Sequence, residues 1–519
     1  MPINFSEYQT DIFDFIKHGY GNAVVQAVPG AGKSFTIIKA LDYIKKDKQV
    51  LFLAFNDSIV QELSLKIDRH KTDVKTLHSL GFSILKSNFK DLEITIDENK
   101  YKKILKTYFD ENGISNEIKL KKQKKYINNI LKLCDFGRLY LATNTHSLLE
   151  LSEKYDMQLL FDEIDITLNI LSLAKNQFNE NGIIDFTDML YLPNVLTVKT
   201  YKYDFIIIDE AQDLSIAQMK LFNKCFKQGG RFIAVGDENQ CIYSFAGSST
   251  DSFDKLKKLP NTIELPLSIC YRCPSKVIDF VKKFNPSIEK NPNAIEGKIK
   301  YDETIEDIQD SDMVLCRNTA PLIGLHVKLL NLGKKSFIKG KDVGLSILNL
   351  IEDIEFEELN QDLSEQGLFS ELINNSKSYV NHLKEKLGVS LEEVFETQMF
   401  SNLCDKIETL EILSQNIETK TELIEKIIEI FSDENKNGIC LSTVHKAKGL
   451  ETNNVFILNN YLMPSKYVKT EWEKQQEMNI QYVAYTRPKE KLSFIYSKSE
   501  NEIEESQITK ELKMQCQYH

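Results

Sequence analysis

The sequence lacks several features that would place it in other classes of protein. No run of apolar residues approaches the ~20 that a membrane-spanning helix needs, so we expect no membrane association. Residues 1–7 contain no basic region followed by an apolar stretch, so the sequence predicts no secretory signal. We therefore expect a cytoplasmic protein, of a bacterium or a virus-infected cell, or a nuclear one.

Paired cysteines are also scarce. The chain has nine cysteines in 519 residues, and only Cys270 and Cys273 form a CxxC pair. A zinc or iron–sulfur site needs more ligands at regular spacing. We therefore interpret the cysteines as reduced thiols, with Cys270 and Cys273 as packing residues.

The chain has no excess of positive charge. Its 65 Lys and Arg residues face 76 Asp and Glu residues, which gives a net charge of −11. This balance excludes a uniformly basic surface but not a local basic channel, because binding to phosphates depends on where the charge lies. The densest basic stretch lies between residues 100 and 125. A solvated helix face and a contact with a DNA backbone fit that stretch equally well.

Short apolar runs give the first indication of the fold. Residues 23–28 form such a run, which ends in Pro29-Gly30; residues 35–46 have helical periodicity, and residues 49–55 form a second apolar run. Strand, helix and strand in this order predict a parallel sheet with crossover helices. Further strands are expected at residues 205–208 and 231–235.

Two long stretches interrupt this α/β pattern. Residues 88–182 and the acidic residues 346–435 are mainly helical in pattern, and strand-like runs return after each. We predict two α/β domains, each with a helical insertion. The predicted boundaries are 1–87 and 183–259 for the first domain, 88–182 for its insertion, 260–345 and 436–519 for the second domain, and 346–435 for its insertion.

A phosphate-binding loop follows the first predicted strand. Residues 27–34 end in Gly32-Lys33-Ser34, although position 27 is Ala where the strict pattern has Gly. Backbone N–H groups at a helix N-terminus cradle phosphate oxygens. Lys33 can reach the β- and γ-phosphates, and Ser34 can hold Mg²⁺. We therefore predict ATP and Mg²⁺ as cofactors, bound by Pro29, Gly30, Ala31, Gly32, Lys33, Ser34 and Phe35.

Two adjacent carboxylates follow another apolar strand. Asp209 and Glu210 come directly after residues 206–208. Open parallel sheets bind ligands at this end of their strands. We predict that Asp209 lies near the metal and that Glu210 orients and deprotonates the attacking water. An acidic loop that caps the strand is the alternative.

The segment DEAQD at 209–213, with the phosphate loop upstream, resembles superfamily 1 helicases of the UvrD/Rep/PcrA type. The segments FN-x-S, TLHSLG and STVHKAKGLE are most similar to those of the F-box DNA helicase branch of this family, although no F-box is visible. The resemblance implies two RecA-like P-loop NTPase domains with ATP in the cleft between them. It also implies an ATP-dependent DNA helicase of DNA repair or replication that moves 3′ to 5′ on single-stranded DNA.

The resemblance assigns nucleotide-binding roles to residues spread along the chain. Gln9 would read the adenine edge, Gln240 would sense the γ-phosphate, and Arg272 would bind phosphates. Arg487 would act as an arginine finger. The remaining implied contacts to the nucleotide come from Tyr271 near the adenine, Glu451 near the ribose, and Gly449.

The same resemblance implies a set of DNA contacts. Those residues are Phe55, Asn56, His78, Tyr243, Phe245, Thr443 and His445. Phe245 stands where the family usually has Trp, and Ala246 stands where it often has Arg. Phe55, His78 and His445 could instead be ordinary core residues.

We expect single-stranded DNA and duplexes with a single-stranded tail as partners. Two alternatives remain open. One is a DNA translocase or protein-displacing ATPase that separates few strands. The other is an ATPase switch subunit of a repair or defence complex, with protein partners bound through residues 346–435.

Overall fold

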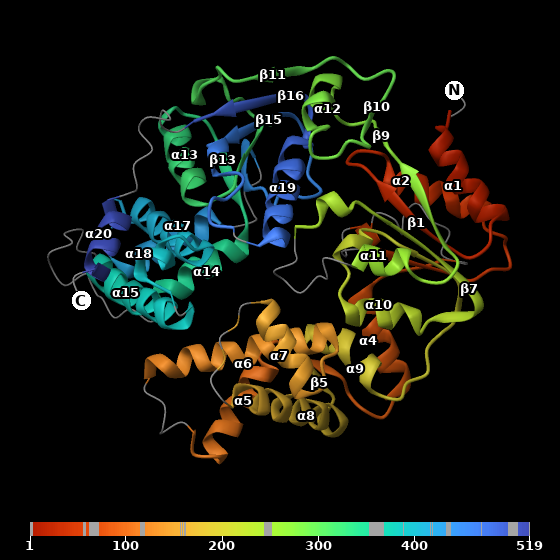
Figure 1. Cartoon of the computed structure of the whole chain (residues 1–519), viewed down its shortest axis with the longest axis horizontal. Coiled ribbons are helices and arrows are strands. Elements are labelled where there is room, and N and C mark those ends of the chain that lie inside the picture. Colours follow the sequence, from red (N-terminus) through yellow and green to blue (C-terminus); the bar gives the residue numbers. More distant parts are fainter. Residues whose placement is uncertain are drawn as a thin grey trace. The chain divides into compact units, whose positions relative to one another are not determined.

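A computed structural model describes the chain as two compact units, Met1–Ser268 and Ile269–His519 (Figure 1). The described residues are all but 1–3, 55–58, 62–71, 115–119, 156, 158, 160–161, 243–251, 352–367, 388, 416, 418, 432–436, 469, 497–506 and 518–519.

The first unit is built on a six-stranded parallel sheet in the order β3-β2-β6-β7-β1-β8. Its strands are β1 (Asn22–Ala27), β2 (Val50–Ala54), β3 (Thr72–Thr76), β6 (Tyr203–Ile208), β7 (Phe226–Gly236) and β8 (Thr262–Leu267). The predicted parallel sheet is confirmed. Its central strands include the short apolar runs of the sequence, as expected for strands that are buried on both faces.

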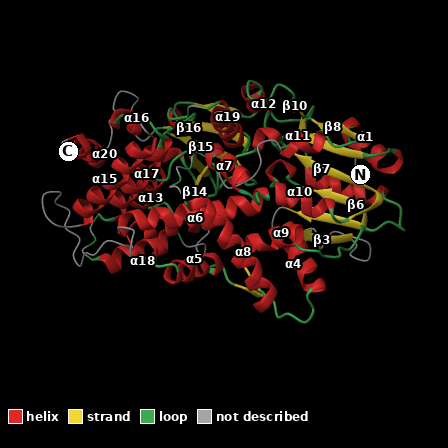
Figure 2. Ribbon diagram, turned by 60° about the horizontal axis from the view of Figure 1, so that its bottom comes forward, coloured by secondary structure: helices red, strands yellow, loops and turns green. Residues whose placement is uncertain are grey.

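Helices cover both faces of this sheet (Figure 2). Val24 and Ile206 face α4 (Leu77–Asn88), α10 (Ile216–Asn223) and α11 (Ser252–Lys257). Their neighbours Val25 and Ile207 point to the opposite face, against α1 (Glu7–His18) and α2 (Lys33–Ala40). This alternation is the two-residue period of a strand. Both faces of one sheet therefore support the elements of the candidate site.

The first helical region comprises α5 (Lys100–Glu111), α6 (Leu120–Tyr140), α7 (Thr145–Lys154) and α8 (Glu163–Asn181). It holds two hydrophobic clusters of its own, one around Ile130 and Ile170 and one around Leu133 and Leu148. Short parallel strands β4 (Thr95–Ile96) and β5 (Ile183–Ile184) pair where the chain enters and leaves the region.

A buried ion network fastens this region to α9 (Phe186–Val195). Asp188 accepts hydrogen bonds from Lys100 Nζ at 2.6 Å, Tyr101 Oη at 2.8 Å and Arg138 Nη1 at 3.0 Å. Arg138 Nη1 also donates to Asp185 at 2.6 Å. Because Lys100, Arg138 and Asp188 are almost completely buried, each charge depends on the others for compensation.

The second unit has its own six-stranded parallel sheet, in the order β11-β16-β15-β12-β14-β13. Its strands are β11 (Lys298–Lys300), β12 (Met313–Cys316), β13 (Ser336–Lys339), β14 (Ile439–Thr443), β15 (Thr452–Leu458) and β16 (Pro488–Ile495). Helices α12 (Ser275–Val281), α13 (Ala320–Asn331) and α19 (Glu471–Tyr485), and the pair β9 (Ile269–Cys270) and β10 (Glu289–Lys290), complete this part. The fold class predicted from the sequence, α/β with two RecA-like parallel sheets, is confirmed.

The second helical region shares its core with this sheet. It comprises α14 (Lys341–Ile351), α15 (Leu368–Leu387), α16 (Leu391–Phe395), α17 (Gln398–Leu413) and α18 (Lys420–Ile430), together with the last helix α20 (Gln507–Gln517). One hydrophobic cluster runs from Leu441 and Phe456 of the sheet to Ile407 and Leu410 of α17. Asp405 of α17 also accepts hydrogen bonds from the backbone N–H groups of Thr319 and Ala320 at 2.9 Å each, where α13 begins.

The observed division of the chain differs from one predicted boundary. We placed the boundary after residue 259, whereas β8 pairs with β1 and the division follows Ser268. The other predicted boundaries stay predictions.

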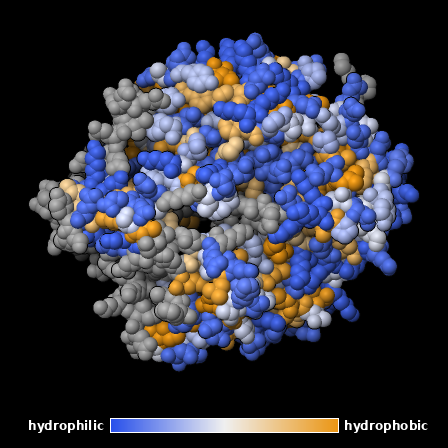
Figure 3. Space-filling model, viewed as in Figure 1, coloured by the Kyte–Doolittle hydropathy of each residue, from blue (hydrophilic) through white to orange (hydrophobic). Residues whose placement is uncertain are grey.

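Within the described residues, the longest helices are too short or too polar to cross a bilayer. On the face of the molecule that Figure 3 shows, hydrophilic residues predominate and the apolar ones lie in small groups.

Candidate functional site

The predicted phosphate loop joins β1 to α2. Gly30 and Gly32 have φ angles of 67° and 76°, a left-handed backbone that favours glycine. A Cβ on Gly32 would meet no atom within 4 Å, so the backbone angle and not space requires glycine there. Lys33 and Ser34 begin α2, and the Ser34 side chain is exposed. The loop thus presents a helix N-terminus, as the sequence predicts.

Gln9, the predicted adenine reader, lies beside this helix. Its Nε2 donates to Thr36 Oγ1 at 2.9 Å, and its Oε1 accepts from Ser6 N at 3.0 Å as part of the cap of α1. Phe35 is 41% exposed next to Phe5, with 6.3 Å between the ring centroids. Gln9 therefore connects α1 to α2, and its contact with adenine stays a prediction.

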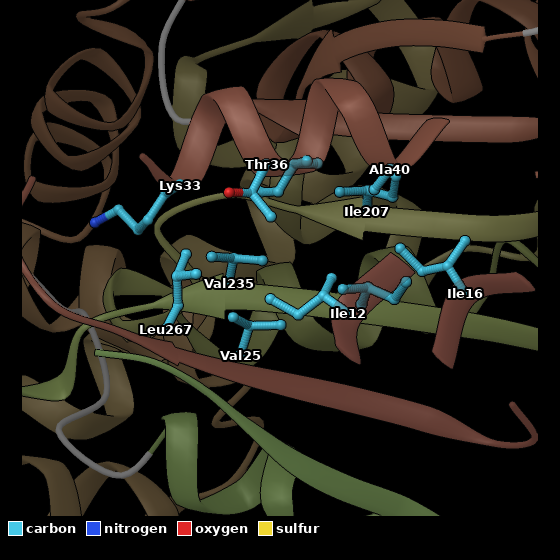
Figure 4. Close-up of a pocket in the computed structure, with 11 residues that line it drawn as sticks. Ile12, Ile16, Val25, Lys33, Thr36, Ala40, Ile207, Val235 and Leu267 are labelled. Atoms are coloured by element: carbon cyan, nitrogen blue, oxygen red, sulfur yellow. The ribbon is translucent and has the colours of Figure 1, made fainter. Parts of the chain in front are cut away.

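A small apolar pocket lies beneath α2, lined by side chains of α1, β1, β6, β7 and β8 (Figure 4). Lys33 and Thr36 are its polar members. In Figure 4 the Lys33 ammonium points away from Ile12, Ile16 and the other apolar side chains. The packing beneath the loop therefore directs the charge of Lys33 out of the core.

Asp209 and Glu210 follow β6 at the same edge of the sheet. Lys33 Nζ lies 3.2 Å from Glu210 Oε1, so the loop and the carboxylate pair come together. Burial, followed by the charge of Glu210, raises the pKa of Asp209 to about 6. Glu210 has a φ of 51°, which is uncommon for a residue with a side chain and marks a constrained position.

A chain of hydrogen bonds links Glu210 to Gln240. Gln212 Nε2 donates to Glu210 Oε2 at 2.6 Å, and Gln212 Oε1 accepts from Asp237 N at 3.1 Å. Gln240 Nε2 in turn donates to Asp237 Oδ2 at 2.7 Å. The predicted general base and the predicted γ-phosphate sensor therefore lie in one network within the first unit.

Sequence reasoning missed Gln212 and Asp237, which connect this network. Both are buried, and burial raises the pKa of Asp237 to about 6. A Cβ on Gly236 would come within 2.2 Å of Gln212 Oε1, so this glycine makes room for the amide. The available signal was two polar residues inside segments that end buried strands, where each needs a partner.

The second unit groups another set of predicted residues. Arg272 Nε donates to Glu451 Oε2, and Arg272 Nη1 donates to Thr486 O at 3.4 Å. Lys489 Nζ lies 2.8 Å from Glu451 Oε1. Although burial opposes the effect, Lys489 and Arg272 hold the pKa of Glu451 below its ordinary value. Tyr271 is 46% exposed beside this group, as stacking on a base requires.

Arg487, the predicted arginine finger, is only 1% exposed. Its Nε donates to Val483 O at 2.8 Å, its Nη1 to Leu450 O at 3.3 Å and its Nη2 to Thr486 Oγ1 at 3.1 Å. Gly449, one residue before Leu450, has a φ of 86°. The structure therefore brings Arg272, Glu451, Gly449 and Arg487 into one neighbourhood of the second unit, and their contacts with a nucleotide stay predictions.

The predicted DNA contacts divide into two groups. Phe55, Asn56, Tyr243 and Phe245 lie outside the described residues. Thr443 ends β14, and His445, two residues further on, is half-buried. Burial, followed by the charges of Arg317 and Lys446, lowers the pKa of His445 to about 3. Its imidazole is therefore neutral at physiological pH.

His78 lies in the first turn of α4, within the segment Thr76–Gly81, and is half-buried. Thr76 Oγ1 accepts from Ser79 N at 3.1 Å, and Ser79 Oγ accepts from Thr76 N at 2.9 Å. A Cβ on Gly81 would come within 1.8 Å of Met189 O. This segment thus caps α4 and lets it cross α9 closely.

Cys270 and Cys273 pack inside the second unit. Cys273 N donates to Cys270 Sγ at 3.3 Å, and Cys273 Sγ donates to Thr486 O at 3.5 Å. Among the described residues no three or more His, Cys, Asp and Glu side chains are grouped so that they could hold a metal. The contacts of both thiols are those of packing residues beside Arg272.

A phosphate loop and paired carboxylates at the edge of a parallel sheet define the class of protein: a P-loop NTPase fold with two RecA-like units. Residues 9–261 match the family described as UvrD/REP helicase N-terminal domain, so this part of the chain is similar to that family. The UvrD/Rep/PcrA resemblance of the motifs is thereby confirmed.

Three relatives illustrate the match. F-box DNA helicase protein 1 of Schizosaccharomyces pombe is 22% identical, over 90% of this chain and 55% of its own length. ATP-dependent DNA helicase Rep of Buchnera aphidicola subsp. Schizaphis graminum is 20% identical, over 96% of this chain and 93% of its own length. ATP-dependent DNA helicase PcrA of Staphylococcus aureus is 22% identical, over 94% and 83% respectively.

The chain spans about half the length of some of these relatives: 55% of the fission yeast protein and 47% of a second Buchnera Rep helicase.

Proposed function

We propose that this chain is an ATP-dependent DNA helicase that moves 3′ to 5′ along single-stranded DNA, with ATP hydrolysed in a cleft between its two units. The observation that carries the proposal is the connected network Lys33–Glu210–Gln212–Asp237–Gln240 beside the phosphate loop. A loop that only bound nucleotide would not need a base and a sensor joined in this way. The match of residues 9–261 to the UvrD/REP helicase N-terminal domain family supports the same conclusion.

In this proposal Glu210 orients and deprotonates the attacking water, and Gln240 senses the γ-phosphate. Lys33 moves from Glu210 to the phosphates when ATP binds, which releases the carboxylate for its role as a base. Arg272 and Arg487 supply positive charge to the phosphates, while Tyr271, Gly449, Glu451 and Gln9 hold the nucleoside.

Mg²⁺ fits the donor set of the site. Ser34 offers an exposed hydroxyl at the start of α2, and Asp209 a carboxylate at the end of β6, both of them oxygen ligands that Mg²⁺ prefers. The ion would neutralise charge on the phosphates. Because Asp209 must be deprotonated to bind it, Lys33 assists by favouring the charged carboxylate.

Single-stranded DNA would contact Phe55, Asn56, His78, Tyr243, Phe245, Thr443 and His445. The aromatic side chains among them would stack on bases, each worth about 1–3 kcal/mol. A duplex with a single-stranded tail is the substrate that the proposal requires.

The test measures ATP turnover with and without single-stranded DNA, and unwinding of duplexes that carry a 3′ or a 5′ tail. We expect stimulation by DNA and unwinding of the 3′-tailed duplex. Lys33→Ala should abolish turnover, whereas Glu210→Gln should lower it by about 10²–10⁴-fold and still bind ATP. Absence of DNA stimulation in the wild-type chain would refute the proposal.

The same assays separate the two alternatives. Translocation without strand separation would identify a translocase or a protein-displacing ATPase. ATP binding that responds to a protein partner of residues 346–435, and not to DNA, would identify a switch subunit of a repair or defence complex.

A further inference from the structure

The second unit contains a buried ion pair that the proposed function does not use. Arg317 follows β12, and Glu477 lies in the middle of α19. Arg317 Nη2 donates to Glu477 Oε1 at 2.8 Å, and Arg317 Nε lies 3.1 and 3.3 Å from the two carboxylate oxygens. The side chains are 15% and 4% exposed. The pair is therefore bidentate and largely withdrawn from water.

Strand pairing places Arg317 beside the predicted DNA-contact segment. In the parallel pair of β12 and β14, Cys316 is opposite Thr443, and Val444 N donates to Cys316 O at 3.0 Å. The residues that follow these two strands, Arg317 and Val444, are therefore neighbours, and His445 comes one residue later. The influence of the Arg317 charge on the pKa of His445 agrees with this placement.

Helix α19 also contacts the far end of the same segment. Arg487 follows α19 and donates to Val483 O of the helix and to Leu450 O. Glu477 lies eight positions before the end of α19 at Tyr485, which corresponds to about 12 Å along a helix. The segment 443–451 is thus connected to α19 near both ends, through Arg317 beside Val444 and through Arg487 at Leu450.

Stability alone gives a weak reason for the pair. Replacing a buried ion pair by apolar groups of similar size is often neutral or stabilising. The carboxylate of Glu477 also accepts from Ser465 N at 2.9 Å, so its orientation is fixed from a second side. A bidentate pair fixed in this way specifies a geometry more than it adds stability.

We propose that Glu477 is a positioning residue, which holds Arg317 beside the start of segment 443–451, so that this predicted DNA-contact segment and the helix that leads to Arg487 shift together. The inference rests on the proposed function, because it requires that DNA accelerates ATP hydrolysis. Glu477 touches neither nucleotide nor DNA in this scheme. It couples DNA contact near the start of segment 443–451 to the position of Arg487 near the end of that segment.

The test compares Glu477→Gln with Glu471→Gln in the full chain. Both changes remove one negative charge from α19, but the Glu471 side chain is 90% exposed. The measurements are basal ATP turnover, turnover with saturating oligo-dT, and the Kd of fluorescent oligo-dT. For Glu477→Gln we expect the DNA stimulation to fall by about tenfold, within the range of coupling between two sites. Basal turnover and Kd should change by less than about threefold, and Glu471→Gln should behave as wild type.

A double-variant cycle distinguishes positioning from a merely structural role. If Glu477 acts through Arg317, the double variant Arg317→Gln/Glu477→Gln should lose no more stimulation than the stronger of the two single variants, Arg317→Gln and Glu477→Gln. The reason is that both changes then interrupt the same path. Effects that multiply would overturn the inference. The double variant leaves no unpaired buried charge, so it carries the test if Glu477→Gln alone does not fold.

The outcomes separate this inference from the proposed function. A wild-type chain without DNA stimulation refutes both. A wild-type chain that is stimulated, with a folded Glu477→Gln or double variant stimulated to the same degree, refutes only the role of Glu477.

Discussion

The two helical regions are attached to their sheets by different means. The first region has its own hydrophobic clusters and is fastened to α9 by the buried network of Lys100, Arg138, Asp185 and Asp188. The second region shares one continuous cluster with the sheet of its unit. Polar fastening depends on every partner being present, whereas a shared core distributes the same task over many apolar side chains.

This difference predicts how each region responds to damage. A buried ion network fails when one member is lost, because the remaining charges have no compensation. A shared core loses stability in proportion to the group removed, and the loss extends to the sheet. The regions should therefore differ both in the cost of a substitution and in how far its effect spreads.

The largest effect is expected from Asp188→Ala. It leaves the buried charges of Lys100 and Arg138 without their shared partner, and the free energy of unfolding of the first unit should fall by about 3–5 kcal/mol. Urea unfolding followed by circular dichroism measures the change. A loss below about 1 kcal/mol, the usual range of an exposed pair, would mean that the network does not fasten the region.

A pair of core substitutions tests how far each effect spreads. Leu410→Ala in α17 and Ile130→Ala in α6 remove fully buried side chains and should each cost about 2–5 kcal/mol. Leu410→Ala should raise hydrogen exchange in β12, β14 and β15 as well as in the helices, whereas Ile130→Ala should raise it only in α5, α6 and α8. Equal spreading in both variants would contradict the distinction.

The pH dependence of the second region follows from Asp405. Burial raises its pKa to about 6, against the backbone N–H groups of Thr319 and Ala320 that lower it. The folded state therefore binds the proton of the Asp405 carboxyl group more tightly than the unfolded state does. The contribution of this proton to the free energy of unfolding is lost as pH rises through about 6. Between pH 5 and pH 7 that contribution should fall by about 1.4 kcal/mol.

The comparison for this prediction is Asp405→Asn, which cannot titrate. Urea unfolding at pH 5 and pH 7 should show a smaller pH difference in the variant than in the wild-type chain. The same slope in both proteins would assign the pH dependence to other groups.

The smallest effect is expected at the exposed rim of the first region. Lys103 Nζ lies 2.7 Å from Asp97 Oδ2, and the hydrogen bond from Lys103 lowers the pKa of Asp97 although burial opposes it. Solvent screens this pair, so Asp97→Asn should cost no more than about 0.5 kcal/mol. If Asp97→Asn cost as much as Asp188→Ala in the same unfolding assay, the exposed rim and not the buried network would attach the first helical region.

Much of the fold follows from short apolar runs that are readable in the sequence, but β8 does not. Its residues Thr262–Leu267 include Glu264 and Pro266 and show no apolar run. Pro is tolerated there because β8 is an edge strand. Its pairing with β1 joins residues about 240 positions apart, which local pattern cannot indicate. This pairing explains why the predicted boundary fell before the strand.

The candidate site was predictable where one residue stands at the end of one strand. Lys33 and Glu210 could be placed in that way, and the structure brings them together. Gln212 and Asp237 could not, because their importance comes from hydrogen bonds between separate loops. Arg317 and Glu477 were missed for the same reason, since 160 residues separate the two members of the pair.

The segment Thr76–Gly81 carries a consequence for reading such sequences. Thr76 and Ser79 form a helix cap, Leu77 and Leu80 belong to the core, and Gly81 permits a close helix crossing. Five of its six residues therefore start or pack the helix, and His78 is the one for which we predict a contact with DNA. A sequence search with this six-residue motif would therefore find proteins that begin and pack a helix in the same way, whatever ligand they bind.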